Sequence, residues 1–152
     1  MYTVDASVWV NSFDYREEGH QCSRQVLQLL RARSLPVIVP NLVLAEVAGA
    51  ISRTRQDGER AGAFVAALQQ LPNVRFLPLD RGLAQRAAGL AGQHRLRGAD
   101  AVYAAVAAQS GCTLLTLDSE HLLRLAPIVP TRTPAQVLSD LRTEPIGPAP
   151  TG

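Results

Sequence analysis

The sequence contains no lysine, since all 15 of its basic residues are arginine. Its two cysteines, Cys22 and Cys112, stand far apart and outside any C-x-x-C or zinc-type spacing, so we expect reduced thiols. No apolar run approaches the ~20 residues of a membrane-spanning helix. Asp5 interrupts the first residues, where a signal peptide would continue its apolar run, so we expect no such peptide. Together these absences predict a cytoplasmic protein without a membrane segment.

The rest of the composition is typical of one folded domain. The 152 residues are 47% hydrophobic, which is enough for one core and too little for two. We place the domain at residues 1–142 and expect residues 143–152, rich in proline and glycine, to form a disordered tail. The formal net charge of +2 is compatible with a polyanionic substrate, because arginine pairs bidentately with phosphate.

Short apolar stretches alternate with amphipathic ones along most of the chain. The apolar stretches predict buried strands near residues 1–4, 36–40, 74–79, 112–117 and, at an edge, 127–130. The segments between the first four carry helical spacing, and the alanine-rich stretch from residue 101 to 108 predicts a helix that packs very close to its neighbours. Such alternation predicts a three-layer α/β/α sandwich with a mostly parallel central sheet.

Four acids occupy positions that invite explanation. Asp5 and Asp118 each follow a predicted strand directly, at the sheet edge where parallel folds place ligand groups. Glu46 is the only ionisable residue between Asn41 and Arg53, and Asp100 begins a helix with almost no other charge. Helix capping or simple exposure remains an alternative explanation for each acid.

A parallel sheet would bring these four carboxylates to one edge, where they would repel one another unless a cation lay among them. Hard divalent cations such as Mg²⁺ prefer oxygen ligands and combine a few carboxylates with phosphate. A site of this kind can lower the pKa of a water molecule and polarise a phosphodiester. The pattern therefore indicates phosphodiester chemistry with a hard divalent cation such as Mg²⁺.

Four segments carry a resemblance to a known family. They are Val-Asp-Ala-Ser at residues 4–7, Leu-Ala-Glu-Val at 44–47, the stretch from Leu96 to Ala107, and Leu-Leu-Thr-Leu-Asp at 114–118. In this order, and in a chain of this length, they resemble the PIN-domain ribonucleases and most closely the VapC-type toxins of toxin–antitoxin modules. The resemblance covers roughly residues 1 to 141.

The resemblance implies a metal-dependent endoribonuclease that cleaves RNA. It implies that Mg²⁺ or Mn²⁺ is held by four catalytic acids, which are Asp5, Glu46, Asp100 and Asp118. It gives Ser7 and Thr116 auxiliary roles as small hydroxyl residues that orient water or ligands. It further implies a homodimer silenced by a cognate antitoxin protein, with DNA bound only indirectly, through that antitoxin.

Several arginines are candidates for contact with RNA phosphates. Arg95 and Arg97 lie just before Asp100 and are the substrate-binding residues that we favour, whereas Arg53 and Arg55 are less favoured. Any of these arginines could instead simply face solvent.

Other classes of site fit less well. Asp80 also follows a strand-like stretch, but a helix N-cap explains it more economically. His20, His94 and His121 lack partners for metal-free RNA cleavage, and we interpret His121 as a polar residue on the helix after Asp118. A haloacid-dehalogenase phosphatase or a receiver domain would need a lysine. A PIN-like module that binds RNA without cutting it, and a housekeeping RNA-processing nuclease, remain open alternatives.

Overall fold

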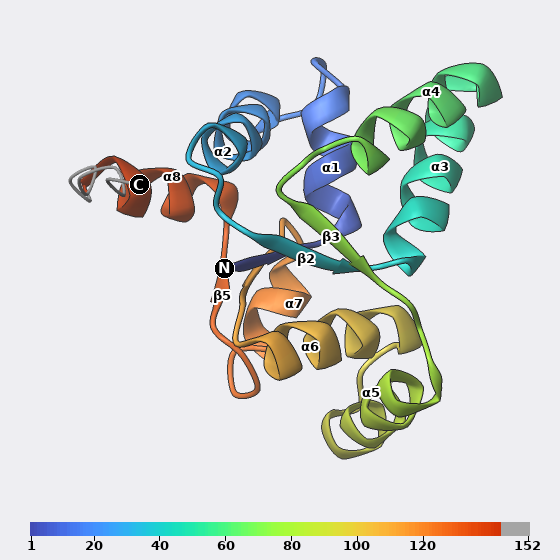
Figure 1. Ribbon diagram of the computed structural model, residues 1–152, viewed down its shortest axis with the longest axis vertical. Coiled ribbons are helices and arrows are strands. Elements are labelled where there is room, and N and C mark those ends of the chain that lie inside the picture. Colours follow the sequence, from blue (N-terminus) through green and yellow to red (C-terminus); the bar gives the residue numbers. More distant parts are fainter. Residues whose placement is uncertain (144–152) are drawn as a thin grey trace.

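The computed structural model describes residues 1–143, which form a five-stranded sheet covered by helices (Figure 1). The strand order is β3-β2-β1-β4-β5, and all four neighbouring pairs are parallel. The strands are β1 (Tyr2–Val4), β2 (Val37–Pro40), β3 (Val74–Leu77), β4 (Thr113–Leu115) and β5 (Thr131–Arg132). The predicted parallel sheet is thus confirmed.

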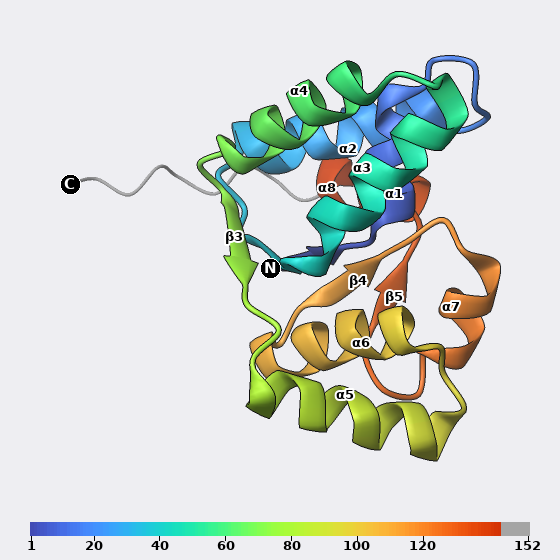
Figure 2. The same cartoon turned by 90° about the vertical axis from the view of Figure 1, so that its right-hand side faces the viewer.

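Helices cover both faces of this sheet, as the side view in Figure 2 shows. On one face lie α1 (Ala6–Phe13), α2 (His20–Ala32), α3 (Leu42–Arg55), α4 (Gly58–Gln69) and α8 (Pro134–Thr143). On the other face lie α5 (Arg81–His94), α6 (Gly98–Ser110) and the short α7 (Ser119–Arg124). The three-layer α/β/α sandwich predicted from the sequence is therefore confirmed.

The neighbouring strands β1 and β4 bring residues that are distant in sequence to the same edge of the sheet. Val4, Leu114 and Leu115 are completely buried, as expected for strands covered on both faces. Val4 pairs with Leu115, so the residues that follow them, Asp5 and Thr116, leave the sheet side by side. The parallel register therefore sets the position of the first candidate acid.

Helix α6 packs against the sheet through small side chains. Ala101, Ala104 and Ala107 are completely buried, and the helix contacts β1, β2 and β4. Because alanine extends only one carbon from the backbone, the helix axis can approach the strands closely. This close packing, predicted from the sequence, fixes the height of α6 above the sheet.

The last strand of the sheet differs from the prediction. It is Thr131–Arg132 and not residues 127–130, because Ile128 and Val129 donate backbone hydrogen bonds to Leu125 and so continue a turn. The ladder starts only where Leu114 donates to the Pro130 carbonyl. Helix α8 is described as far as Thr143, and residues 144–152 of the predicted tail lie outside the described residues.

The capping of α5 by Asp80, predicted from the sequence, is confirmed. The Asp80 carboxylate accepts a hydrogen bond of 2.8 Å from the Leu83 backbone N–H and caps α5. At the start of α8, Thr133 and Gln136 exchange the reciprocal hydrogen bonds of a capping box. Cys22 and Cys112 are free thiols. Across residues 1–143, no helix has the length and apolarity needed to cross a membrane.

The close packing of α6 predicts that Ala104→Leu will lower the free energy of unfolding by about 1–3 kcal/mol, because the added atoms have no space. Urea denaturation at neutral pH measures this change. Ala108→Leu is the matched control on the exposed side of the same helix and should change stability by less than about 0.5 kcal/mol. Equal effects of the two substitutions would contradict the close packing.

Candidate active site

Asp5 lies at the carboxyl end of β1 and is 6% exposed. Although it occupies the N-cap position of α1, its side chain makes no capping hydrogen bond. Its Oδ2 atom instead accepts hydrogen bonds from Ser7 Oγ at 2.7 Å and Thr116 Oγ1 at 2.9 Å. The carboxylate is therefore held by hydroxyl groups from two segments and is not used to start the helix.

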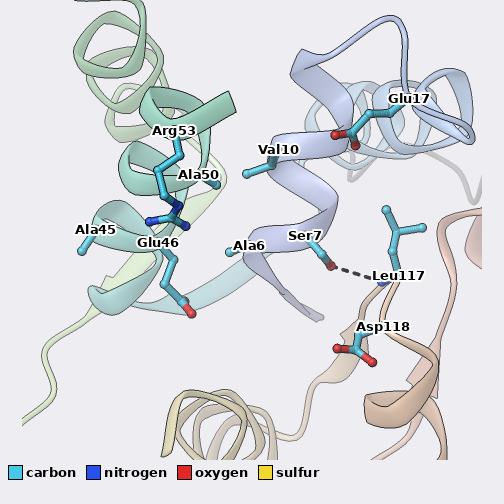
Figure 3. Close-up of a pocket in the computed structure, with 10 residues that line it drawn as sticks. All are labelled: Ala6, Ser7, Val10, Glu17, Ala45, Glu46, Ala50, Arg53, Leu117 and Asp118. Atoms are coloured by element: carbon cyan, nitrogen blue, oxygen red, sulfur yellow. Dashed lines mark hydrogen bonds between the residues drawn. The ribbon is translucent and has the colours of Figure 1, made fainter. Parts of the chain in front are cut away.

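The same two hydroxyls also fix the loop after β4. Ser7 Oγ accepts a hydrogen bond from the Leu117 backbone N–H at 3.2 Å, drawn as a dashed line in Figure 3, and Thr116 Oγ1 accepts one from the Asp118 N–H at 3.1 Å. Each hydroxyl thus donates to Asp5 and accepts from the segment that carries Asp118. Ser7 and Thr116 set the spacing between these two acids.

His121 lies among three of the predicted acids. Its Nε2 atom is 2.8 Å from Asp100 Oδ1 and 3.7 Å from Asp118 Oδ2, while its Nδ1 atom is 3.6 Å from Asp5 Oδ2. Helix α7 directs the ring there, because the other Asp118 oxygen caps that helix at the backbone N–H groups of Glu120 and His121. The fold thus places an imidazole at the point where the three carboxylates converge.

The charges at this point shift the pKa values of both partners. The hydrogen bond to Asp5 raises the pKa of His121 to about 9 against the effect of burial, and the charges of Asp100, Asp5 and Asp118 add to the increase. Burial opposes ionisation of Asp5, but hydrogen bonds from His121, Ser7 and Thr116 outweigh burial and lower the pKa of Asp5. At neutral pH the site therefore contains an imidazolium cation.

Glu46 approaches the same edge from α3 on the opposite face of the sheet. Its Oε2 atom accepts a hydrogen bond of 2.6 Å from the hydroxyl of Tyr103, which belongs to α6 and is 2% exposed. Tyr103 is thus a core residue whose hydroxyl reaches the site. This hydrogen bond connects α6 and α3, which lie on opposite faces of the sheet, at the position of Glu46.

The pKa of Glu46 is raised. Burial is the largest cause, and the negative charges of Asp5 and Asp100 add to it, while the Tyr103 hydrogen bond and His121 act in the opposite direction. Asp5 and Asp100 are thus close enough to Glu46 for their charges to disfavour its ionisation. Glu46, Asp5 and Asp100 therefore share one electrostatic environment, and Asp118 adjoins it through His121.

A cleft of about 730 Å³ opens beside this site between α1 and α3 (Figure 3). Glu46, Asp118 and Ser7 lie along it, and small apolar residues of α1 and α3 form much of its wall. Its ten lining residues are Ala6, Ser7, Val10, Glu17, Ala45, Glu46, Ala50, Arg53, Leu117 and Asp118. Glu46 and Asp118 are therefore accessible from the cleft, whereas Asp5 and Asp100 do not line it.

One of the four candidate arginines lines the cleft. Arg95 and Arg97 are exposed at the α5–α6 junction and do not line the cleft. Arg55 forms an ion pair with the buried carboxylate of Asp14. Arg53, which the sequence did not favour, lines the cleft. No signal in the sequence separated Arg53 from the other exposed arginines.

His121 is the site residue that the sequence analysis missed. The available signal was its spacing, since it stands three residues after Asp118 on a predicted helix and residues three apart share a face. That spacing gives proximity to Asp118 alone. The contacts with Asp5 and Asp100 arise only from the fold.

The donor set is suited to a hard divalent cation. All four acids offer oxygen ligands, and the charges of Asp5 and Asp100 add to the effect of burial in raising the pKa of Glu46, a contribution that a cation would offset. Within residues 1–143, however, no three Asp, Glu, His or Cys side chains form a preformed metal cage. The His121 ring lies between three of the carboxylates, where its protonated form supplies positive charge.

Comparison with known proteins identifies the family. A family model for the PIN domain matches residues 2–126, which include all four acids. Because this span is most of the chain, the protein belongs to the PIN domain family. No curated protein has a sequence that matches this chain.

Solved structures show the same fold. VapC20 from Mycobacterium tuberculosis, a toxin described as cleaving the sarcin–ricin loop, has 21% identity and a TM-score of 0.70 over 85% of this chain and 97% of its own. FitAcB from Neisseria gonorrhoeae has 22% identity and a TM-score of 0.67, covering 89% and 99%. VapBC2 from Rickettsia felis, solved with promoter DNA, has 15% identity and a TM-score of 0.67, covering 87% and 97%. At these identities the similarity establishes a shared fold.

The raised pKa of Glu46 predicts that Glu46→Gln will stabilise the metal-free protein. A raised folded pKa means that the fold disfavours the carboxylate, so the wild type loses stability as pH rises through that pKa. In EDTA at pH 7, urea denaturation should show a gain of up to about 1 kcal/mol, which shrinks as the pH falls and Glu46 becomes protonated. Glu18→Gln, at an exposed loop position, should show no such gain. A less stable Glu46→Gln protein at every pH would refute the electrostatic argument.

The raised pKa of His121 predicts the opposite dependence. Its stabilising contribution is complete below about pH 6.5 and is lost as the pH rises through about 9. In EDTA, wild type should therefore exceed His121→Gln in unfolding free energy by about 1–3 kcal/mol at pH 6, with the difference closing by pH 10. Denaturation across this pH range, with exposed His94→Gln as control, measures the effect. A difference independent of pH would show that packing, and not charge, explains the contribution.

Proposed function

We propose that this protein is a metal-dependent endoribonuclease and the toxin of a toxin–antitoxin pair. The observation that carries the proposal is the gathering of Asp5, Glu46, Asp100 and Asp118, distant in sequence, beside one open cleft. The charges of Asp5 and Asp100, which add to the effect of burial in raising the pKa of Glu46, support it, because a divalent cation would offset that negative charge. Membership of the PIN domain family agrees with this chemistry.

In this proposal the four carboxylates hold Mg²⁺ or Mn²⁺. The metal supplies Lewis-acid polarisation of the phosphodiester and lowers the pKa of water. Ser7 and Thr116 keep Asp5 oriented toward the site through their hydrogen bonds. His121 must leave its position among Asp5, Asp100 and Asp118 if the cation is to take the same space.

The reaction is hydrolysis of an RNA phosphodiester. The oxygen of a water molecule attacks phosphorus while one of the carboxylates accepts the water proton. The bond between phosphorus and the 3′ oxygen breaks, and that oxygen takes up a proton. The products are a 5′-phosphate and a 3′-hydroxyl, so the open cleft must admit the RNA chain on both sides of the broken bond.

The structural neighbours support the biological role. VapC20 is described as an RNA-cleaving toxin, and VapBC2 was solved with promoter DNA. By analogy, this chain forms a homodimer in the cytoplasm, is silenced by a cognate antitoxin protein and meets DNA only through that partner. The proposed four-acid site in turn favours a catalytic domain over a PIN-like module that has lost activity.

Asp5→Asn tests the site. The variant should lose at least about 100-fold in cleavage of structured RNA with Mg²⁺ or Mn²⁺, because an amide cannot replace an anionic ligand. Gel analysis of labelled RNA measures the rate, and EDTA should abolish cleavage by the wild type. Asp140→Asn, at an exposed position of α8, is the matched control and should retain the rate.

Two outcomes would contradict the proposal. Cleavage by Asp5→Asn at the wild-type rate would show that these acids do not form the catalytic site. A folded wild-type protein that binds structured RNA but cuts no transfer, ribosomal or messenger RNA with either metal would instead indicate a non-catalytic binding module.

A further inference from the structure

Arg53 lies on the same face of α3 as Glu46, two helical turns further along. The residues at the intervening positions of that face are Gly49 and Ala50. Glu46, Ala50 and Arg53 all line the cleft, and Figure 3 shows Arg53 reaching back along the helix toward Glu46. Helix α3 therefore places a carboxylate of the candidate site, Glu46, and the guanidinium of Arg53 on the same face.

The absence of a side chain at Gly49 makes room for the Arg53 guanidinium. A Cβ atom at position 49 would lie 3.0 Å from Arg53 Nη1, closer than ordinary contact, and the next two nearest atoms also belong to that guanidinium. The guanidinium thus rests over bare helix backbone. Any larger residue at position 49 would displace the Arg53 guanidinium from its position over the helix backbone.

Within the described part of the chain, Arg53 has no ion pair or hydrogen bond from its side chain. Arg55, two residues further on, is paired with Asp14 and is unavailable. Arg53 is also the one basic residue among the ten that line the cleft. Its guanidinium donors are therefore free, in a place that a polyanion must pass to reach the acids.

We propose that Arg53 binds a backbone phosphate of the RNA strand next to the phosphodiester that is cut, and that Gly49 positions it. This inference rests on the proposed function. Glu46, Asp118 and Glu17 give the cleft a negative lining that repels RNA, so a guanidinium is needed to hold the strand there. Arginine suits this role, because its planar group donates two parallel hydrogen bonds to one phosphate.

The test measures RNA binding without cleavage. A labelled single-stranded RNA oligonucleotide is titrated with protein in EDTA at several salt concentrations, and fluorescence anisotropy gives the dissociation constant. Arg53→Gln should weaken binding about tenfold at low salt and reduce the salt slope by about 0.7, the value for one phosphate contact on a single strand. Arg31→Gln, at an exposed position of α2, is the matched charge control and should leave the salt slope unchanged.

Gly49→Ala tests the positioning role. It should weaken binding in the presence of Arg53 but have no further effect in an Arg53→Gln background, whereas a general structural effect would be the same in both. Its Tm should not fall, because alanine favours the helix and the displaced group is the end of a flexible side chain. Additive effects of the two substitutions would overturn the role of Gly49.

The outcomes separate this inference from the proposed function. An unchanged salt slope in Arg53→Gln, or a wild-type protein that does not bind the oligonucleotide, overturns the phosphate contact even if metal-dependent cleavage is intact. If Asp5→Asn cleaves RNA at the wild-type rate while Arg53→Gln still reduces the salt slope of RNA binding, the nuclease proposal is overturned. The cleft would then bind RNA without forming the catalytic site.

Discussion

Repulsion among carboxylates at one edge of the sheet is the constraint on which the local structure depends. The parallel register of β1 and β4 places Asp5 beside the loop that carries Asp118, and α6 adds Asp100. The protein counters this repulsion in three ways: hydroxyl donors to Asp5, an imidazolium among three acids, and a tyrosine hydroxyl on Glu46. These interactions stabilise the carboxylates without separating them, so their negative charges remain close together at this edge of the sheet.

Much of this arrangement could be predicted from the sequence, because it depends on local patterns. The alternation of apolar and amphipathic segments predicts a parallel sheet, and a parallel sheet gathers the residues that follow its strands. Asp5 and Asp118 follow strands directly, so that rule alone brings them near each other. Glu46 was conspicuous for a different reason, since a lone charge in an apolar helix needs a partner, and Tyr103 provides one.

The remaining features depend on tertiary contacts that no local pattern encodes. His121 reaches Asp100 because α7 packs beside the amino-terminal end of α6, and helical spacing linked it only to Asp118. Arg95 and Arg97 are near Asp100 in sequence, yet neither lines the cleft, whereas Arg53 does. The last strand lies at Thr131–Arg132 and not at residues 127–130, because Ile128 and Val129 donate backbone hydrogen bonds to Leu125 and continue a turn.

Helix α6 has a consequence that follows from its alanine face. It carries both Asp100 and Tyr103, and Tyr103 donates a hydrogen bond to Glu46 of α3, so one helix holds one of the four acids and the partner of another. Asp100 and Tyr103 are three residues apart, which is about 4.5 Å along the helix axis. Because that helix packs closely on the sheet, its position cannot adjust independently of the strands. Loops on the surface can therefore diverge while this spacing is kept.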